Sequence, residues 1–348
     1  MAAARPSRRK QSASDRNERF ERLAAPYRRE IKLHCYRMLG SLHEGEDLVQ
    51  ETYFRAWRSF ESFDGSGSFR AWLYRIATNA CLNALATHKR AQRWLPDERG
   101  PSTTQLPDGE PAAEVVWLEP YPDKELVGVA DSVPDPEARY AAHESVQLAF
   151  VAAIQHLPPR QRAVLLLCDV LGWAAAEVTT LLGGSTASIN SALQRARETL
   201  SKRYPRQAPP APATIDVAQK DLLGRYLQAW EGLDLDAFVA LLKEDATYTM
   251  PPLPQWYAGR EAIRAFFAWA WKRYAGFRLL PIQANRQPAF ATYSRPSADA
   301  GWAAHSIQVL TLDDAALSRV TLFVKPHAPR LFQAFGLPLS LEDAGHHS

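Results

Sequence analysis

The chain has 348 residues, 46% of them hydrophobic and 23% charged, with a formal net charge of +3. Its length predicts two or three domains, and it contains no apolar run long enough for a membrane span or a secretory signal. Because its three cysteines are widely separated, we expect no disulfide framework and no metal site, in a reduced cytoplasmic protein. We also expect no cofactor and no binding to membranes.

The charge is distributed unevenly along the chain. Residues 1–95 carry 18 basic and 10 acidic side chains, whereas residues 96–143 carry 3 basic and 11 acidic ones. Residues 144–207 are again basic, with a net charge of +3, and residues 208–348 are neutral. Two basic blocks joined by an acidic bridge favour a front half that binds a polyanion.

Residues 1–18 are polar and basic, which predicts a disordered arm. From residue 19 to about 92, apolar residues recur at helical spacing. The stripes are Tyr27, Ile31, Cys35 and Met38; Val49, Tyr53, Ala56 and Phe60; and Phe69, Trp72, Leu73, Ile76 and Ala80. We therefore predict a compact bundle of three helices.

These helices also carry polar faces. Asp47, Glu51 and Arg55 lie four residues apart on the side away from the core, and Arg75, Asn79 and Asn83 repeat that spacing on the next helix. Cations and amides beside aromatic residues such as Trp72 suit unpaired bases, on which aromatic rings can stack. The alternative is that the aromatic residues only form the core.

Residues 96–143 contain eight prolines and no sustained period, so they predict an acidic linker. One segment, 117–123, has aromatic residues that are unusual in a free spacer. Helical periodicity returns at Glu144, and a second proline-rich joint covers residues 205–215.

Residues 174–203 have the pattern of a helix-turn-helix. Gly183 and Gly184 predict the turn, and Ser185 or Thr186 can cap the following helix. The side of that helix away from its apolar face carries small, amide and basic side chains: Ser188, Asn190, Ser191, Gln194, Arg195, Arg197 and Lys202. Such a surface favours reading of the DNA major groove, and a surface helix of some other helical domain is the alternative.

Residues 216–345 begin with helices and continue with strands. A strand is predicted over 247–250 and a helix over 260–271, followed by strands over 276–284, 289–294, 302–312 and 317–325. Helices followed by an antiparallel sheet are typical of an α+β domain.

Two sets of motifs carry a family resemblance. The segments EDLVQETYFRAW (46–57) and FRAWLYRIATNACLN (69–83) resemble conserved region two of bacterial extracytoplasmic-function sigma factors. The segments LPPRQRAVLLL (157–167), GWAAAEV (172–178) and INSALQRAR (189–197) are similar to their region four. With YRREIKLHCYRM (27–38) and PPLPQWY (251–257), the chain resembles the actinobacterial sigma-G-like subgroup, which carries a C-terminal SnoaL-like domain.

The resemblance implies a multidomain architecture. Two all-α domains, the region-two bundle (19–95) and the region-four helix-turn-helix (144–204), would precede a C-terminal α+β cone of the NTF2-like, SnoaL-like type (216–345). The function it implies is promoter recognition and DNA melting for core RNA polymerase, with the C-terminal domain modulating activity. No catalytic residue is implied.

The resemblance also implies site residues. Asp47, Gln50, Glu51 and Arg55 would dock on the clamp helices of the polymerase β′ subunit, and region four on the flap of the β subunit. The −10 element would be read by Phe63, Asp64, Ser66, Trp72, Arg75, Asn79 and Asn83. The −35 element would be read by Ser188, Asn190, Ser191, Gln194, Arg195 and Arg197.

The linker and the C-terminal domain have less definite roles. In the family the linker threads toward the RNA exit channel, where an acidic segment would suit a channel built for RNA; a solvated spacer is the alternative. A pocket for a small-molecule ligand is expected in the cone, near Tyr248, Met250, Trp256, Tyr257 and His305, with Phe267 and Trp269 as further candidates. A core role for each of these residues remains open.

Two other functions fit parts of the sequence. A stand-alone helix-turn-helix regulator would explain residues 144–203 but not the region-two motifs. A fusion whose C-terminal domain is a cyclase or isomerase would explain the cone, but no acid-base pair can be identified in it.

Overall fold

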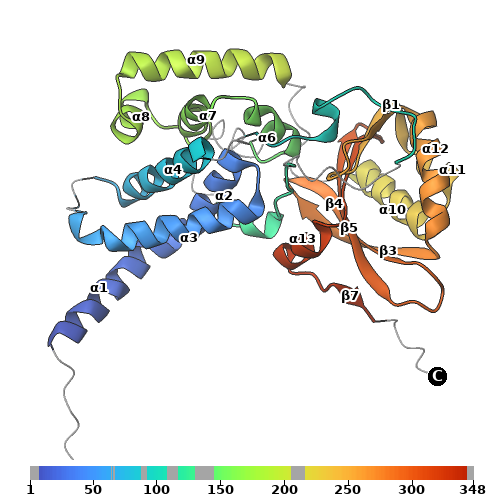
Figure 1. Ribbon diagram of the computed structural model, residues 1–348, viewed down its shortest axis with the longest axis horizontal. Coiled ribbons are helices and arrows are strands. Elements are labelled where there is room, and N and C mark those ends of the chain that lie inside the picture. The colour runs from blue at the N-terminus through green and yellow to red at the C-terminus, as the bar shows by residue number, and fades with distance from the viewer. Residues whose placement is uncertain are drawn as a thin grey trace, which may run out of the picture. The chain divides into compact units, whose positions relative to one another are not determined.

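The structure is a computed structural model that describes residues 8–63, 65, 67–87, 92–107, 117–129, 145–204 and 216–342, with side chains from Ser14 onward. The chain divides into two compact units (Figure 1). One comprises Met1–Ala91, Gly128–Ala142 and Ala153–Arg203, and the other Gln92–Val127, His143–Ala152 and Tyr204–Ser348. Within the described ranges, no helix has the length and apolar character needed to cross a membrane.

The described part of the first unit is helical. Its front elements are α1 (Arg8–Ala24), α2 (Arg28–Leu39), α3 (Leu42–Arg58) and α4 (Phe69–Thr87). They are followed by α7 (Pro159–Leu165), a π-turn at Leu166–Val170, α8 (Ala175–Leu182) and α9 (Thr186–Arg203). The short helix α6 (Leu148–Gln155) begins in the second unit and ends in the first.

Helix α1 corrects the expectation of a disordered arm over residues 1–18. From Arg8 the chain is helical, because the arm continues into apolar residues that anchor it: Phe20 and Ala24 are buried. The ring of Phe20 packs edge-on against Phe60 and Phe69, at 5.4 and 6.4 Å between centroids. Polar residues of good helix propensity can extend a helix whose end is fixed by packing.

The junction of α2 and α3 follows from local chemistry. Gly40 ends α2 in the left-handed region, with φ of 67°, where a side chain would be strained. Ser41 then caps α3 by accepting a hydrogen bond from the backbone N–H of Glu44 at 3.2 Å. Gly45 lets the helices approach closely, because a Cβ there would lie 3.3 Å from the backbone nitrogen of Tyr36.

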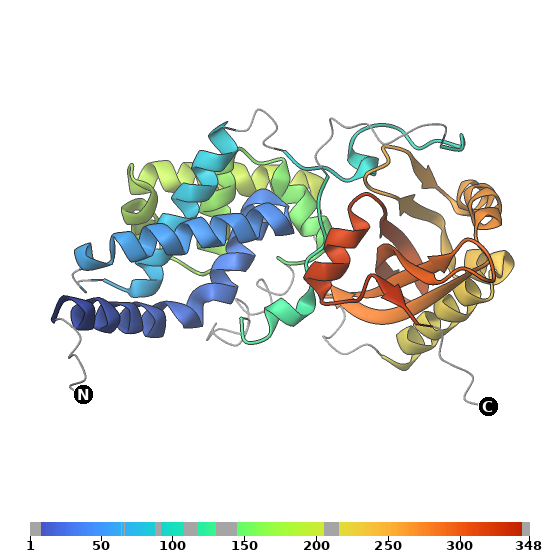
Figure 2. The same ribbon diagram turned by 60° about the horizontal axis from the view of Figure 1, so that its bottom comes forward.

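The second unit contains a curved sheet with the strand order β2-β1-β6-β5-β4-β3 (Figures 1 and 2). Its strands are β1 (Leu242–Thr249), β2 (Trp256–Ala258), β3 (Gly276–Ala284), β4 (Gln287–Arg295), β5 (Trp302–Asp313) and β6 (Ala316–Phe323). The short β7 (Ser340–Leu341) pairs with β5. All neighbours are antiparallel except β1 and β6. The predicted α+β order is confirmed.

Helices cover both faces of this sheet. The helices of the unit are α10 (Val217–Glu231), α11 (Leu235–Ala240), α12 (Arg260–Ala270) and α13 (Ala328–Phe335). Phe290 of β4 stacks on Tyr226 of α10 at 5.4 Å, while Tyr293, three residues further along, packs on Phe332 of α13 at 5.2 Å. Because side chains alternate along a strand, α10 and α13 lie on opposite faces.

One irregularity in β5 affects a predicted site residue. Ala304 pairs with Tyr293 and Ser306 pairs with Thr292, so His305 has no partner across the strand pair. This is a β-bulge, in which two steps on one strand oppose one step on the other and the extra residue is re-aimed.

Candidate functional site

The surface predicted to read the −10 element lies on α4. Arg75, Asn79 and Asn83 are all exposed, and their spacing of four residues aligns them along one face of the helix. Phe63 and the half-buried Trp72 lie nearby, with ring centroids 5.3 Å apart. The predicted residues Asp64 and Ser66 lie outside the described residues. The structure thus brings together a row of polar side chains and an aromatic platform.

The predicted polymerase-binding face lies on α3. Asp47, Gln50 and Arg55 are exposed and Glu51 is half-buried, with the Arg55 Nε atom 2.6 Å from a Glu51 carboxylate oxygen. The same helix also exposes Phe54, whose side chain is 55% accessible.

Phe54 and its neighbour Trp57 were missed by the sequence predictions. Trp57 is 38% exposed and contacts α1, where its indole N–H donates to Asn17 at 2.8 Å. Large aromatic residues are enriched in the buried centres of protein interfaces. Both residues lie outside the apolar stripe of their helix, and this position in the sequence indicates that they are aromatic residues at the surface.

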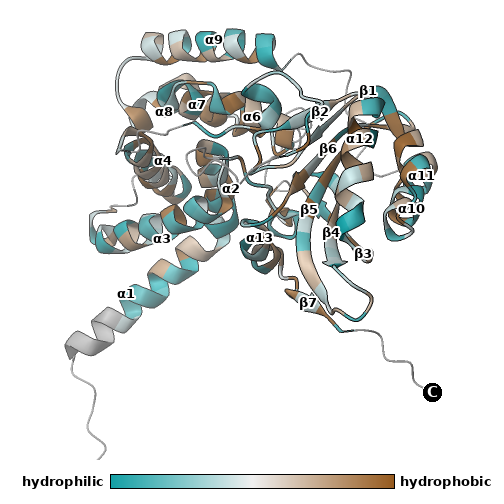
Figure 3. Ribbon diagram, turned by 45° about the vertical axis from the view of Figure 1, so that its right-hand side comes forward, coloured by the Kyte–Doolittle hydropathy of each residue, from teal (hydrophilic) through white to brown (hydrophobic). Residues whose placement is uncertain are grey.

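The helix-turn-helix is formed by α8 and α9. Gly183 and Gly184 have positive φ, and a Cβ at Gly184 would lie 2.9 Å from the hydroxyl of Ser188. Ser185 caps α9 by accepting from the Ser188 N–H at 3.2 Å. Hydrophilic residues recur along the ribbon of α9 (Figure 3). All predicted −35 residues are exposed on this helix: Ser188, Asn190, Ser191, Gln194, Arg195 and Arg197.

Some of these −35 candidates already have intramolecular partners. Arg197 holds Asp169 through two hydrogen bonds, of 2.9 Å from Nε and 2.6 Å from Nη2, and this pairing raises the pKa of the guanidinium. The Ser188 hydroxyl donates to the Ser185 carbonyl at 2.7 Å. Gln194 donates to Glu198 at 3.0 Å. Asn190, Ser191 and Arg195 are therefore the clearest candidates for DNA contact.

Inside the first unit, the two helical regions are joined by a buried arginine. Arg162 of α7 donates to the Met38 carbonyl of α2, to the Gln155 side chain at 2.6 Å, and to the Gln155 carbonyl at 2.7 Å. Burial lowers its pKa to about 9. Gln155 in turn donates to the Arg37 carbonyl at 3.1 Å. Because buried donors are costly to leave unpaired, this network fixes α7 against α2.

A second contact joins the same regions. The ring of Trp173, just before α8, packs on Tyr74 of α4 with centroids 5.2 Å apart. The guanidinium of Arg70 lies 5.9 Å from the Trp173 ring. Helices from residues 28–87 and from residues 159–203 thus share one packed interior.

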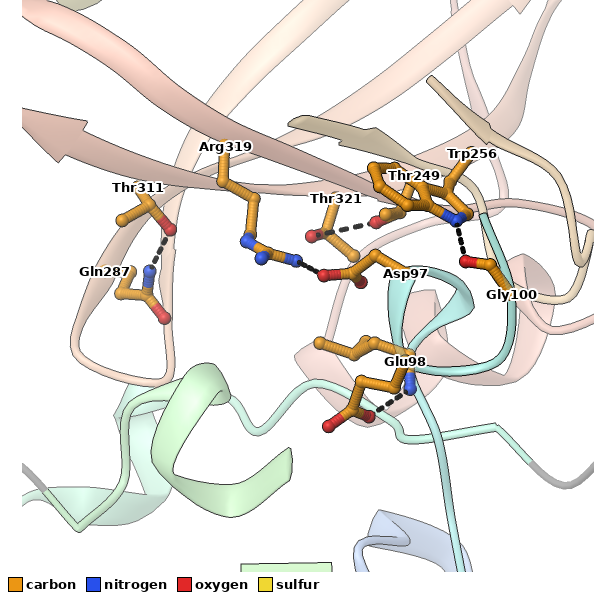
Figure 4. A network of polar contacts seen from close by, with 10 residues as sticks. Asp97, Glu98, Gly100, Thr249, Trp256, Gln287, Thr311, Arg319 and Thr321 are labelled. Atoms are coloured by element: carbon orange, nitrogen blue, oxygen red, sulfur yellow. Dashed lines mark hydrogen bonds and ion pairs between the residues drawn. The ribbon is translucent and has the colours of Figure 1, made fainter. Parts of the chain in front are cut away.

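In the second unit, the acidic linker is bound along the C-terminal sheet (Figure 4). Asp97 forms an ion pair of 2.6 Å with Arg319 of β6. The Trp256 indole N–H donates to the Gly100 carbonyl at 2.8 Å, and the Thr103 N–H donates to the Trp256 carbonyl at 2.9 Å. The described linker residues therefore do not form a free spacer.

A later described part of the linker, around Tyr121, is also bound to the sheet. At the turn between β3 and β4, Asn285 accepts from the Tyr121 N–H at 2.8 Å and donates to the Tyr121 carbonyl at 2.9 Å. The linker also meets the residues just before it, since the Leu118 N–H donates to the Trp94 carbonyl at 3.0 Å. The aromatic residues of segment 117–123, unusual for a spacer, are explained by this docking: Trp117 and Tyr121 are buried.

A cavity of about 480 Å³ lies in the second unit, between the sheet and α12. Of the predicted pocket residues, Tyr248, Met250 and His305 line it, as do Phe267 and Trp269. Trp256 and Tyr257 were predicted in the same pocket but are not among its lining residues. They bind the linker instead, and the Tyr257 hydroxyl donates to the Gln105 carbonyl at 3.0 Å.

His305 is held in its neutral form. Burial, with a smaller effect of Lys325, lowers its pKa to about 4. Its Nε2 atom lies 3.3 Å from the Tyr274 hydroxyl and its Nδ1 atom 3.0 Å from the Ser306 hydroxyl. At neutral pH the imidazole is thus a polar group without charge, in which one ring nitrogen donates a hydrogen bond and the other accepts one.

We expect a substitution H305Q to reduce the acid sensitivity of the protein. As pH falls below about 6.5, the unfolded chain binds a proton at this histidine while the folded one does not, so each pH unit down to about 4 removes about 1.4 kcal/mol from the free energy of unfolding. Chemical denaturation at pH 7, 6 and 5 measures that slope, with H156Q as the control. Equal slopes for wild type and H305Q would contradict the assignment.

Comparison with family models assigns the three parts of the chain. The model described as Sigma-70 region 2 matches residues 23–91, that of Sigma-70 region 4 matches residues 147–200, and that of a SnoaL-like domain matches residues 223–320. These ranges contain the α3 and α4 surfaces, the predicted −35 residues of the helix-turn-helix and most of the residues that line the cavity, respectively.

Relatives match the chain over much of its length. The chain is 46% identical to the ECF RNA polymerase sigma factor SigG of Mycobacterium tuberculosis over 336 residues, which cover 95% of this chain and 87% of that protein. It is 30% identical to SigJ of the same organism over 62% of this chain and 59% of SigJ. The crystal structure of SigJ aligns with a TM-score of 0.56, covering 92% of this chain and 99% of that one at 24% identity, which bears on the fold alone.

Proposed function

Because the chain belongs to the extracytoplasmic-function sigma factors of bacterial RNA polymerase, we propose that its SnoaL-like domain controls initiation by holding the linker between regions two and four. As a sigma factor, the chain binds core polymerase and promoter DNA and acts in transcription initiation. Separate surfaces of the chain bind polymerase and DNA, and docking of the linker limits initiation. The protein acts in the cytoplasm.

The exposed surfaces support a role for each helix. The α3 face, with Phe54 at its centre, binds the clamp helices of the polymerase β′ subunit, and region four binds the β flap. The row of Arg75, Asn79 and Asn83 on α4 captures unpaired −10 bases, which present flat faces for stacking and edges for hydrogen bonds. Helix α9 enters the major groove at the −35 element, where Asn190, Ser191 and Arg195 have no side-chain partner among the described residues and read the bases.

The packing of the first unit supports a closed resting state. Two DNA readers that bind separate promoter elements cannot remain fixed to each other, so the Arg162 and Trp173 contacts must open when polymerase spaces them. The Arg197–Asp169 pair must also open before Arg197 can contact a phosphate. Each opening draws on the binding energy of polymerase and DNA.

The docked linker is the observation that carries the proposal. Linker residues that would enter the RNA exit channel are bound instead along β2, β6 and the β3–β4 turn, through Asp97, Gly100, Thr103 and Tyr121. The same backbone groups cannot serve both partners. Docking on the SnoaL-like domain therefore competes with engagement of polymerase.

The cavity supports binding rather than turnover. None of its described lining residues is an aspartate or glutamate, although a carboxylate is a common proton acceptor in general acid-base catalysis. The domain thus offers a neutral histidine and aromatic walls, which suit a ligand-binding role.

Run-off transcription with core polymerase tests the proposal. We expect transcripts from selected promoters with the full chain, and more transcript with a chain that ends at Arg206, because its linker is no longer held. No transcript from either protein would contradict sigma activity on promoters. Equal or lower output from the shorter chain would contradict control by linker docking.

A further inference from the structure

The cavity of the SnoaL-like domain has the size and walls of a ligand site. Its volume, about 480 Å³, falls within the range of about 300–1,000 Å³ that is typical for small-molecule pockets. Aromatic rings from α10, α12, the turn after α12 and the start of β3 form most of its wall, including Trp230, Phe266, Trp269, Trp271, Tyr274 and Phe277. Flat aromatic walls favour flat aromatic ligands, which stack on them.

The polar groups of the cavity are neutral and few. Trp271 is only 6% exposed, yet its indole N–H has no hydrogen-bond partner among the described residues. A buried donor without an acceptor costs free energy, and a ligand oxygen would remove that cost. His305, re-aimed by the β-bulge, and the hydroxyl of Tyr274 provide a second hydrogen-bonding position on another wall.

Charge further restricts the ligand. Arg273 and Lys325 are exposed members of the cavity lining, and no described lining residue is acidic. Arg273 lies over the Trp269 ring, with its guanidinium carbon 3.5 Å from the ring centroid. An anionic substituent at these cations is favoured, and a cationic ligand is not.

We propose that the cavity binds a planar aromatic molecule that carries carbonyl or other acceptor oxygens and an anionic substituent, and that this ligand strengthens the hold on the linker. The aromatic walls stack the ring system, Trp271 donates to a ligand oxygen, and Arg273 and Lys325 face the anion.

The link to the linker comes from Pro107. This residue is part of the cavity wall, at the end of the segment that Trp256 and Tyr257 bind. A ligand gains contact with Pro107 only while the linker is docked. By linkage, a ligand that prefers the docked state shifts the protein toward that state. This regulatory consequence rests on the proposed function, whereas ligand binding itself does not.

Binding is tested with anthraquinone-2-carboxylate, a planar diketone with one anionic group, by quenching of tryptophan fluorescence in the full chain. We expect saturable binding that W271F, which keeps a ring but loses the N–H, weakens about 3- to 10-fold. The control W302F removes the N–H of a tryptophan outside the cavity and should leave the affinity unchanged. Decanoate, an aliphatic anion, should bind at least about 10-fold more weakly because it cannot stack.

Two results would overturn the ligand assignment. One is the absence of saturable anthraquinone-2-carboxylate binding to the folded wild-type chain. The other is an equal loss of affinity in W271F and W302F, which would place the probe elsewhere.

Hydrogen exchange of the Thr103 amide, which donates to Trp256, tests the link to the linker in the absence of polymerase. We expect slower exchange when the probe is bound. Binding without slower exchange would overturn the coupling but leave the ligand site. Because neither measurement uses polymerase, failure here is distinguishable from failure of sigma activity, which run-off transcription reports.

Discussion

Alanine at Arg75, Asn79 and Asn83 together should reduce run-off transcription at least about 100-fold, since each polar base contact that is lost costs about 1–3 kcal/mol and each 1.4 kcal/mol is tenfold. The three side chains lie exposed along one face of α4, so their removal leaves the helix intact. Permanganate reactivity of −10 thymines should fall in parallel, because melting depends on capture of unpaired bases.

The matched control is alanine at Gln228, an exposed polar residue of α10, which should leave transcription unchanged. Binding of the triple variant to core polymerase should equal that of wild type, because α3 is unaltered. Normal promoter opening by the triple variant would show that α4 does not read the −10 element.

The substitution F54D should weaken binding to core polymerase about 30- to 1,000-fold, the range expected when a central aromatic contact worth about 2–4 kcal/mol is lost. Phe54 is 55% exposed in the free chain, with Arg58 stacked over it at 5.7 Å. A charge placed there must be desolvated when the interface forms. Competition against a labelled sigma factor for core polymerase measures the change.

V217D is the control for F54D, because Val217 is an equally apolar residue, 83% exposed, on a helix without a predicted polymerase contact. It should bind polymerase as wild type does. Circular dichroism of both variants establishes that they fold. Wild-type affinity of a folded F54D variant would remove α3 from the polymerase interface.

Much of the fold could be predicted because local chemistry and burial agree. The strand predicted over 276–284 has those bounds as β3, since Asn285 and Arg286 adopt the positive φ that a two-residue hairpin needs. The exposed row on α4 follows from helical spacing alone. These features depend on residues that are close in sequence, so a sequence pattern can predict them.

Other features depend on contacts between distant residues and left little trace in the sequence. Trp256 and Tyr257 were expected in the pocket because they are aromatic and near Tyr248, but they bind the linker. The β-bulge that re-aims His305 has no glycine to mark it. Asp169, which pairs with Arg197, lies 28 residues away from it. In each case the partner, and not the residue type, decides the role.

The central claim is that the C-terminal domain restrains the sigma factor by holding its linker, and charge reversal at the Asp97–Arg319 pair tests it most directly. The pair is partly buried, with side chains 14% and 29% exposed, respectively. R319D places two carboxylates together, and we expect transcription by the full chain to rise about 5-fold, equivalent to ~1 kcal/mol. The double variant D97R/R319D restores opposite charges, and transcription should return to the wild-type level.

D97R can also change transcription directly, through the contact of the linker with polymerase. This direct effect is measured in the chain that ends at Arg206, and the transcription of the double variant is corrected for it. The decisive measurement is then transcription by D97R/R319D relative to R319D. A return toward the wild-type level is the predicted result. Output that stays as high as in R319D, or that never rose in R319D, would contradict restraint by linker docking.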